Sequence, residues 1–471
     1  MTPLELAYLA PLLLLALTVV VAMLLISFAR QHLSVAAVTG MGLAGAFVSS
    51  AWHITRPAQK IGFLLMLDAS AYFYIAVLCA ISLFITLLAY DYFRERQRDP
   101  EEFYLLLVLA TIGCATLVSA SHFAALFLGL ETLSISLYAM IGYTYRRERS
   151  IEAGIKYLVL AAVSSAFLAF GMALIYARTG RLDFAAFGSV RAQGPWILSV
   201  IGFGMMLVGI GYKLAVVPFH FWTPDVYEGS PAPATAFIAT ASKLAIVGLV
   251  LRMLSQMNAP LSHGLFVTLA AISIASMLLG NVLALLQTNV KRILAYSSIG
   301  QLGYVLVAFL TARAMATTAA TYYIVAYALT TLGAFGVVSV LSTPENEAEE
   351  IADLNGLAWR RPGLAAVMCA MMFSLAGIPL TAGFIGKFYV VAAGAQSALW
   401  AVLIVLAISS TIGVFYYLRI VLAMFSADEK RMELRSISMG AVLALLAVAA
   451  LVIFFGAYPA PLISMLRGFM Q

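Results

Sequence analysis

Two apolar segments of this sequence are interrupted in the same way. One reads Lys213-Leu-Ala-Val-Val-Pro218-Phe-His220, and the other reads Ser374-Leu-Ala-Gly-Ile-Pro379-Leu-Thr-Ala-Gly-Phe. Proline removes a backbone hydrogen bond from a helix, so each segment is expected to be a helix that breaks midway. Broken helices of this kind mark the ion path of many transporters, although proline is also tolerated in ordinary membrane helices.

The composition indicates that most of the chain lies in a membrane. Hydrophobic residues make up 63% of the 471 residues and charged residues only 10%, against about 45–50% and about 25% in soluble domains. The three cysteines lie in apolar runs without metal-binding spacing, so disulfide, zinc and iron–sulfur sites have little support. The net charge of +6 is explained by arginines in loops rather than by binding to nucleic acid.

The apolar runs predict an all-α membrane protein with about 14 transmembrane helices. They lie near residues 4–28, 33–52, 69–90, 103–120, 122–143, 157–177, 197–221, 231–256, 263–287, 294–311, 317–341, 363–391, 398–424 and 437–458. These runs are too long for the strands of a membrane barrel. The first run is followed, not preceded, by its basic residue, so we expect a retained helix rather than a signal peptide. The two interrupted runs are the seventh and twelfth, and this odd offset predicts two repeats of opposite topology.

Basic residues predict which loops face the cytoplasm. The loops after odd-numbered spans hold the larger set, which comprises Arg30, Arg94–Arg98, Arg146–Arg149, Lys291, Arg292, Arg360, Arg361, Lys430, Arg431 and Arg435. The other side holds Arg56, Lys60, Arg178, Arg181, Arg191, Arg252, Arg313 and Arg467. The positive-inside rule therefore places the first set in the cytoplasm and both termini on the outer side. The acidic loop Glu345–Glu350 with Asp353 is expected to be a solvated linker.

Lysine and arginine are distributed differently along the chain. Lys213, Lys243 and Lys387 lie within apolar runs and Lys156 begins one, whereas the arginines lie almost wholly in loops or at span ends. This difference has a chemical reason, because arginine stays charged whereas a buried lysine can lose its proton. Glu131 lies mid-span without a local cation, so its partner is expected on another helix, with Lys213 or Lys156 as the candidates. These residues suit proton transfer, although each also suits a static ion pair.

Three further polar residues follow the first interruption. His220, close to Pro218, is expected either to cap the freed backbone or to relay protons. Asp225 and Glu228 are expected to shape the loop between the seventh and eighth spans. No GxGxxG, P-loop, HExxH or GxSxG site stands out in the sequence, so nothing in it points to nucleotide binding or hydrolysis.

Four stretches together resemble a known family. The most specific runs from Tyr212 to Pro233, and the others are Ala239–Lys243, Asn289–Ile299 and Leu375–Phe388. They resemble the antiporter-like subunits of respiratory complex I, the bacterial NADH-quinone oxidoreductase, and the resemblance covers essentially the whole chain.

The resemblance implies a proton-translocating, multi-pass subunit of the bacterial inner membrane that works beside other membrane-arm subunits. NADH, FMN, iron–sulfur clusters and quinone are then expected in partner subunits, with no redox centre, cofactor or metal in this chain. The resemblance also implies four parts, which are spans 1–3 (1–102), a first five-helix repeat (103–256), a second inverted repeat (257–425) and a C-terminal helix (426–471).

The resemblance assigns roles residue by residue. Glu131 and Lys213 resemble the family's acid–lysine pair, and Lys243 resembles its central lysine. Lys387 resembles the lysine of the second broken helix, and Lys156 resembles a further residue of the polar axis.

One position departs from the family. Gln301 stands where several relatives carry histidine, and because glutamine cannot titrate, any relay at this point would have to use bound water.

The sequence therefore predicts redox-driven proton translocation. A signal from quinone reduction elsewhere would alter the pairing of Glu131 with Lys213, whose proton would pass towards Lys243, and Lys387 would complete transfer to the outer side. Two alternatives stay open. The chain could belong to a multi-subunit sodium/proton antiporter with similar lysines and no NADH chemistry, or it could be a passive scaffold of a membrane complex.

Overall fold

The structure is a computed structural model that describes residues 3–94, 96, 99–185, 197–256, 262–311, 313–344, 347–427 and 437–468. Six residues used in the orientation and linker predictions lie outside this part of the chain, namely Arg98, Arg191, Glu345, Lys430, Arg431 and Arg435. The described chain is almost entirely helical, which confirms the predicted fold class. Helices satisfy their own backbone hydrogen bonds, as an apolar membrane interior requires.

The chain divides into two compact units, and each is described by itself. The first comprises Met1–Thr86, Asp99–Leu214 and Ala241–His263. Its elements are α1 (Pro3–Tyr8), α2 (Ala10–Phe28), α3 (His32–His53), β1 (Gln59–Ile61), β2 (Leu65–Leu67), most of α4 (Ala69–Phe93), α5 (Glu101–Ser119), α6 (Phe123–Ile141), α7 (Glu148–Thr179), α9 (Ile197–Leu214) and α12 (Ala241–Gln256).

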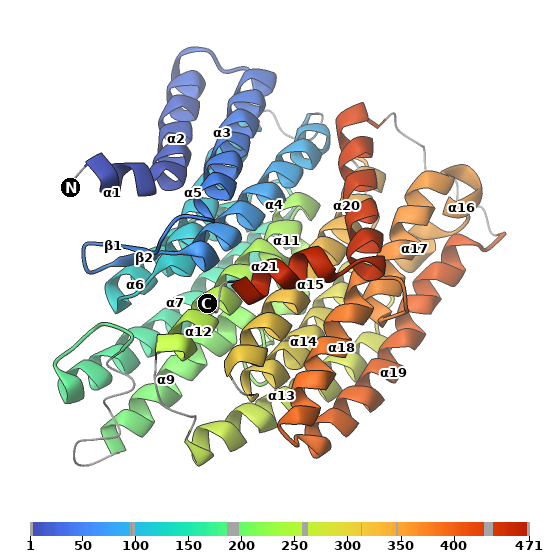
Figure 1. Cartoon of the computed structure of the whole chain (residues 1–471). Helices are drawn as coiled ribbons and strands as arrows, with labels where there is room; N and C mark the ends of the chain where they lie inside the picture. The colour runs from blue at the N-terminus through green and yellow to red at the C-terminus, as the bar shows by residue number, and fades with distance from the viewer. Residues whose placement is uncertain are drawn as a thin grey trace. The chain divides into compact units, whose positions relative to one another are not determined.

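Within this first unit, helices pack on one another in pairs. Helix α2 packs on α3, α5 on α6 and α7 on α9, while α12 contacts both α5 and α9 (Figure 1). Buried aromatic side chains such as Tyr72, Tyr104 and Tyr157 fill the space between helices. The antiparallel hairpin of β1 and β2 was not expected from the sequence.

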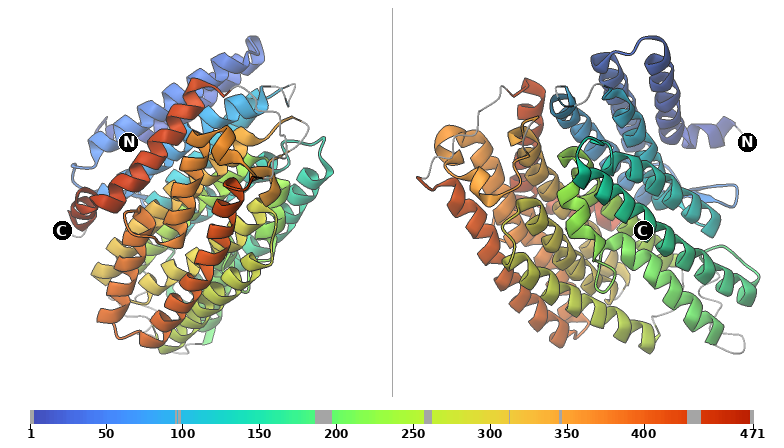
Figure 2. Two further views of the ribbon diagram at one scale, coloured as in Figure 1. Left: turned by 90° about the vertical axis from the view of Figure 1, so that its right-hand side faces the viewer. Right: turned by 180° about the vertical axis from the view of Figure 1, so that it is seen from behind.

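The second unit comprises Leu87–Arg98, Ala215–Thr240 and Gly264–Gln471. Its elements are α10 (Trp222–Gly229), α11 (Ala232–Ala239), nearly all of α13 (His263–Leu285), α14 (Val290–Phe309), α15 (Arg313–Leu341), the 3-10 helix η2 (Ile351–Leu354), α16 (Leu357–Arg360), α17 (Pro362–Ala376), α18 (Ala382–Gln396), α19 (Trp400–Met424), α20 (Met439–Ala457) and α21 (Ala460–Gly468). Helix α15 is central to this unit and packs against α11, α14, α17, α18 and α20 (Figure 2).

The predicted spans agree with the helices, with some differences at the breaks. Among the described residues, 13 helices are long and apolar enough to cross a membrane. The predicted twelfth span is split into α17 and α18, and the eighth is split at Thr240 into α11 and α12. The seventh span ends at Leu214, before the proline that was expected to break it. Helix α7 begins at Glu148, well before the predicted start near residue 157.

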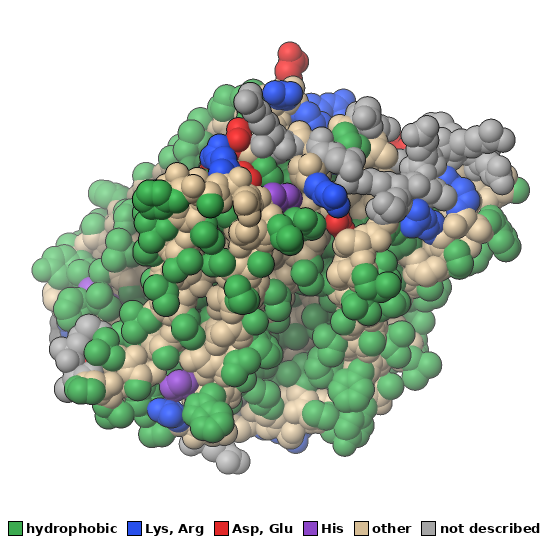
Figure 3. All heavy atoms as spheres, turned by 90° about the horizontal axis from the view of Figure 1, so that it is seen from above, with side chains coloured by type: hydrophobic (Ala, Val, Ile, Leu, Met, Phe, Trp, Pro, Cys, Tyr) green, Lys and Arg blue, Asp and Glu red, His purple; other side chains and the backbone are tan. Residues whose placement is uncertain are grey.

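Large apolar side chains cover much of the surface. Exposed examples include Leu17 and Met23 on α2, Phe415 and Leu422 on α19, and Leu443 on α20. Figure 3 shows hydrophobic side chains over most of the face that it presents, with charged side chains gathered near one edge. Apolar surface on this scale fits contact with lipid and not with water.

Loops that were predicted on the same side of the membrane meet in the structure. In the first unit, β2 bridges to Ala120 through Leu65, and Arg252 binds Asp68 through two hydrogen bonds of 2.7 and 2.8 Å. In the second unit, Arg96 of the third loop donates to the carbonyl of Thr343 in the eleventh. These contacts agree with alternation of the loops between two sides, and the assignment of one side to the cytoplasm stays a prediction.

Candidate functional site

Lys213 occupies the last turn of α9 and is buried. A cation is favoured at this end of a helix, because unpaired carbonyls give it a partial negative charge. The Nζ atom of Lys213 donates to Ser134 Oγ on α6 at 2.6 Å and to Tyr157 OH on α7 at 3.4 Å. Lys213 therefore lies among uncharged hydroxyl groups in the middle of the first unit.

Glu131 lies on the same helix as Ser134, three residues earlier, so both side chains share one face of α6. Its Oε1 accepts a hydrogen bond of 2.6 Å from Ser165 on α7. Among the described residues, Glu131 and Lys213 do not form an ion pair within 4 Å, and Ser134 lies next to Lys213 instead. The structure thus brings the predicted pair into one polar cluster without joining the two charges.

Lys243 lies in the first turn of α12 and is fully buried. The positive end of a helix dipole disfavours a cation at this position. Its Nζ atom donates to the backbone carbonyl of Lys213 at 2.6 Å, which is one of the carbonyls left unpaired at the end of α9. The two lysines predicted to exchange a proton are therefore adjacent.

Lys387 lies on α18 and closes the break that precedes it. Its Nζ atom donates to the carbonyls of Leu375 and Ala376 at 3.0 and 2.9 Å and to Ser410 Oγ on α19 at 2.9 Å. The two carbonyls belong to the last residues of α17, which have no partner within that helix. All three N–H groups of an ammonium are thus accepted by uncharged oxygens.

Gln301 on α14 is tied to the same break. Its amide nitrogen donates to Leu375 O at 3.1 Å and to Tyr417 OH at 3.0 Å, and Tyr323 OH donates to its amide oxygen. Lys387 and Gln301 thus share Leu375 as acceptor. Protein groups take both N–H donors of this amide, and a relay through bound water at Gln301 stays a prediction.

The breaks themselves lie beside the predicted prolines. Ala215, which follows α9, and Gly377, which follows α17, both adopt left-handed backbone conformations, with φ of 58° and 84°. A Cβ on Gly377 would lie 2.9 Å from the Lys387 side chain, so only glycine fits this turn. Pro218 and Pro379 follow these turns rather than sitting inside a continuous helix.

His220 is buried and its ring stacks on Phe221 at 4.5 Å between centroids. Its Nδ1 atom is buried and has no hydrogen-bond partner among the described residues. The capping role considered from the sequence would need such a bond, so this geometry gives it no support, and the relay role stays a prediction.

Lys156 is placed differently from the other three lysines. It lies near the start of α7, where its Nζ atom is 2.7 Å from Glu152 Oε1, and 41% of its side chain is exposed. Its predicted place on a buried polar axis stays a prediction.

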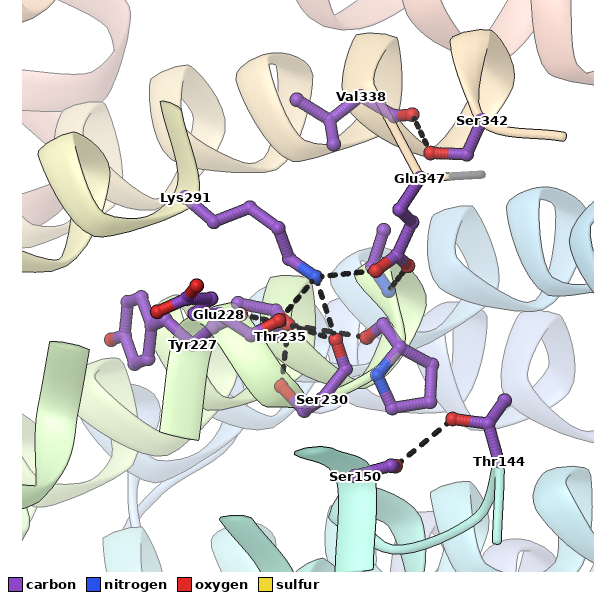
Figure 4. A network of polar contacts seen from close by, with 12 residues as sticks. Thr144, Ser150, Tyr227, Glu228, Ser230, Thr235, Lys291, Val338, Ser342 and Glu347 are labelled. Atoms are coloured by element: carbon purple, nitrogen blue, oxygen red, sulfur yellow. Dashed lines mark hydrogen bonds and ion pairs between the residues drawn. The ribbon is translucent and has the colours of Figure 1, made fainter. Parts of the chain in front are cut away.

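One expectation from the sequence was wrong. The acidic segment was expected to be a solvated linker, yet the side chain of Glu347 is completely buried and lies 2.8 Å from the equally buried Nζ atom of Lys291 (Figure 4). Asp225 and Glu228, which were expected to shape a loop, lie on helix α10, and both accept hydrogen bonds from Arg292, at 2.9 and 2.7 Å. The sequence signal for Lys291 was its place in the motif beginning at Asn289, whereas nothing local distinguished Glu347 from its acidic neighbours.

Comparison with known proteins identifies relatives along the whole chain. A family model described as "NADH:quinone oxidoreductase/Mrp antiporter, TM" matches residues 120–413. A protein of Ectopseudomonas mendocina (strain ymp) named NADH-quinone oxidoreductase subunit N is 45% identical over 98% of this chain and 95% of its own length.

Solved structures share the fold. A chain of respiratory complex I from Thermus thermophilus with bound Aureothin is 32% identical with a TM-score of 0.84, over 96% of this chain and 98% of that chain. A chain of the membrane-bound sulfane sulfur reductase, an archaeal respiratory membrane complex, has a TM-score of 0.87 at 23% identity. A chain of the Mrp complex from Dietzia sp. DQ12-45-1b has a TM-score of 0.86 at 18% identity. Each of these two alignments covers 99% of this chain and 97% of the other, and they show the fold alone.

Proposed function

The chain belongs to the family of NADH:quinone oxidoreductase and Mrp antiporter membrane subunits, and on this premise we propose how it translocates protons in the membrane arm of a NADH-quinone oxidoreductase. Its partners are the other subunits of that complex. The observation that carries the proposed path is that Lys213 and Lys387 are buried at helix breaks and, within the described part of the chain, donate only to uncharged oxygens. A buried lysine without a carboxylate partner can exist with or without its proton, as a transfer site requires.

The first step concerns Glu131 and Lys213. In the structure Glu131 is held by Ser165, and Lys213 by Ser134, one helical turn along α6 from the acid. Closing this short separation would form an ion pair and hold the proton on Lys213, whereas the open arrangement weakens that hold. We assign the signal from quinone reduction to a change between these two arrangements.

The second step concerns Lys213 and Lys243. The Nζ atom of Lys243 reaches the main chain of Lys213, so both ammonium groups lie in one buried region. Two positive charges close together in a medium of low dielectric constant repel strongly, so a proton arriving on one lysine favours its loss from the other. This coupling links the protonation of Lys213 to that of Lys243, and the entry and exit sides set the direction of transfer.

The third step places the exit of the proton at Lys387, with His220 as an intermediate group. Lys387 donates hydrogen bonds to three uncharged oxygens. These oxygens stabilise the ammonium group less strongly than a carboxylate would, so Lys387 can still release its proton. Pro218 and Pro379 mark the breaks that leave carbonyls free for Lys243 and Lys387. We also propose that residues 103–256 and 257–425 are inverted repeats, because each contains one such break.

The proposal assigns redox chemistry to other subunits. NADH, FMN, iron–sulfur clusters and quinone would be bound there, and this chain would carry no redox centre. The part of the chain that the structure describes contains no cluster of three or more His, Cys, Asp or Glu side chains that could hold a metal ion. The location proposed is the bacterial inner membrane, with both termini on the outer side.

The sodium/proton antiporter is the rival function. The similarity to the Mrp chain extends to the fold at 18% identity, whereas the relative named subunit N is 45% identical. Purification in a mild detergent distinguishes the two functions by the subunits that accompany the chain. We expect flavin and iron–sulfur subunits to co-purify with the chain, and their consistent absence would favour the antiporter.

The substitution Lys213→Ala tests the proposed path and distinguishes it from a passive scaffold. Lys213→Ala should assemble normally but lose most coupled proton pumping, because a titrating site disappears while the surrounding apolar packing largely remains. The measurement is the proton-to-electron ratio in vesicles that contain the assembled complex. Lys60→Ala, which removes an exposed lysine from β1, is the matched control. Normal coupled turnover in the Lys213→Ala complex would refute the path and leave the scaffold function.

A further inference from the structure

Lys291 is a fully buried lysine of the second unit and, like Lys387, has three hydrogen-bond acceptors. Its side chain has no exposed surface, and its Nζ atom donates to Glu228 O, Ser230 O and Glu347 Oε2 at 2.9, 2.9 and 2.8 Å. An ammonium group has three N–H donors, so all of them are used. Such a group differs from the buried lysines of the proposed path, because one of its three acceptors is a carboxylate.

Glu347 is surrounded in the same complete way. Besides Lys291, its carboxylate accepts hydrogen bonds from the backbone N–H of Ala232 at 3.3 Å and from Tyr92 OH. Arg96 Nη1 lies 3.8 Å away. A buried carboxylate needs such partners, because removing one partner of a buried ion pair leaves an uncompensated charge in the interior and is strongly destabilising.

Lys291 and Glu347 bind opposite sides of the turn that joins α10 to α11. Helix α10 ends at Gly229 and α11 begins at Ala232. Lys291 binds carbonyls at the negative end of α10, and Glu347 binds an N–H at the positive end of α11 (Figure 4). Each charge therefore complements the helix end that it contacts.

Hydrogen bonds within the turn also stabilise it. The hydroxyl groups of Ser230 and Thr235 lie 2.6 Å apart, and Thr235 Oγ1 also reaches the carbonyl of Pro231 at 3.1 Å. The linker that carries Glu347 is tied to the start of α14, because Ile351 N donates to Thr288 O at 3.0 Å. Ion pair, turn and linker thus form one connected assembly.

The chain connects this turn directly to the proposed proton path. Helix α11 follows the turn, and Thr240 then joins it to α12, whose first turn carries Lys243. Helix α11 and Thr240 are the stretch of chain between the turn and α12, so the turn anchors the segment that precedes Lys243 in the sequence. We infer that the Lys291–Glu347 pair is a positioning element, which holds the α10–α11 turn and the segment leading to Lys243 in the geometry required for proton transfer.

Four variants separate the geometry of the pair from its titration. Lys291→Arg keeps a donor that cannot lose its proton, and Glu347→Gln keeps an acceptor that cannot titrate. Lys291→Arg keeps the charge and the donors, so its coupled pumping should stay within about twofold of wild type. Glu347→Gln exchanges one of two accepting oxygens for an NH2 group, so its pumping should lie between that of Lys291→Arg and that of Glu347→Ala. Lys291→Met and Glu347→Ala remove the contacts and should lower pumping about tenfold or more, since misplacement by about 1 Å can cost about 100-fold in rate.

The readout is the proton-to-electron ratio in vesicles, with co-purification of the complex as the measure of assembly. A purely structural role would change assembly but leave this ratio unchanged in the complexes that do assemble. Arg181→Met, which breaks an exposed ion pair with Asp183, is the control and should leave both quantities unchanged. A wild-type ratio in assembled Lys291→Met would overturn the inference. The inference would also be overturned if Lys291→Arg or Glu347→Gln lost as much pumping as Lys291→Met, because that result would show that the pair must titrate.

If Lys291→Met does not assemble, a milder variant tests the positioning role. Tyr92→Phe removes one hydrogen bond from Glu347 and keeps the ring. We expect normal assembly with a ratio lowered by about twofold, equivalent to about 0.4 kcal/mol, and an unchanged ratio would overturn the inference. The inference rests on the proposed function, so Lys213→Ala is measured in parallel. Normal pumping in Lys213→Ala refutes the proposed path, whereas loss there with normal pumping in Tyr92→Phe refutes only the positioning role.

Discussion

Lys387 offers the sharpest test at the scale of single residues. If the residue supplies only a fixed positive charge, Lys387→Arg should be nearly harmless. If it must release a proton in each cycle, arginine should fail, because it stays charged at any physiological pH. We expect Lys387→Arg to assemble and to reduce proton pumping substantially, as measured by the proton-to-electron ratio and the membrane potential of vesicles.

The packing around Lys387 calls for a control. The guanidinium group is larger than an ammonium group, and Lys387 packs against Gly377 at the break. Lys387→Met therefore accompanies it, since methionine removes the charge without adding bulk, and it should also fail to pump. Lys60→Arg repeats the same chemical change at an exposed position and should pump normally. Wild-type ratio and potential in Lys387→Arg would reassign Lys387 to a structural role.

The sequence identified buried lysines better than it identified their partners. Lys213 and Lys387 stood out because charge is rare inside apolar runs. Their acceptors, Ser134 and Ser410, did not, because a serine in a membrane helix is common and its partner lies on another helix. Glu347 was misplaced for the same reason, since an acidic run normally faces water and its buried partners lie far away in the sequence.

At the scale of helices, close packing depends on glycines where two backbones approach. A Cβ on Gly113 of α5 would lie 2.6 Å from Leu133 N and 2.8 Å from Gly129 O, both backbone atoms of α6. Backbone cannot yield as a flexible side chain does, so we expect Gly113→Ala to destabilise the protein by about 1–3 kcal/mol. The measurement is the thermal unfolding midpoint of the purified chain in detergent.

The matched control is Gly204→Ala on α9, where a Cβ would meet nothing within 4 Å. Alanine is the better helix former by about 1 kcal/mol, so this variant should unfold at the same temperature or slightly higher. Equal midpoints for Gly113→Ala and Gly204→Ala would show that α5 and α6 do not depend on this close contact.

Helix positions were predictable from the sequence, but the exact breaks were not. Apolar length alone located the spans, because the membrane requires about 20 apolar residues for each. The proline pattern located the breaks only approximately. Helix α9 ends at Leu214 and α17 at Ala376, each a few residues before its proline, because the left-handed turns at Ala215 and Gly377 already end the helix.

At the scale of the whole molecule, the distribution of basic residues predicts orientation. The loop with Arg146–Arg149 should face the cytoplasm, and the hairpin with Lys60 should face outward, because basic loops are retained on the cytoplasmic side. Structure supports the premise that loops alternate, since β2 and Arg252, both from even-numbered loops, meet their predicted same-side neighbours Ala120 and Asp68.

Thiol labelling of spheroplasts with a membrane-impermeant reagent measures this orientation. Arg146 and Lys60 are both exposed, so Arg146→Cys and Lys60→Cys give accessible thiols. Cys79 and Cys114 are buried and only Cys369 is partly accessible, so Cys369→Ser removes the background. We expect Lys60→Cys to react in intact spheroplasts and Arg146→Cys to react only after the membrane is opened. The reverse pattern would place both termini in the cytoplasm and would put the exit assigned to Lys387 on the cytoplasmic side.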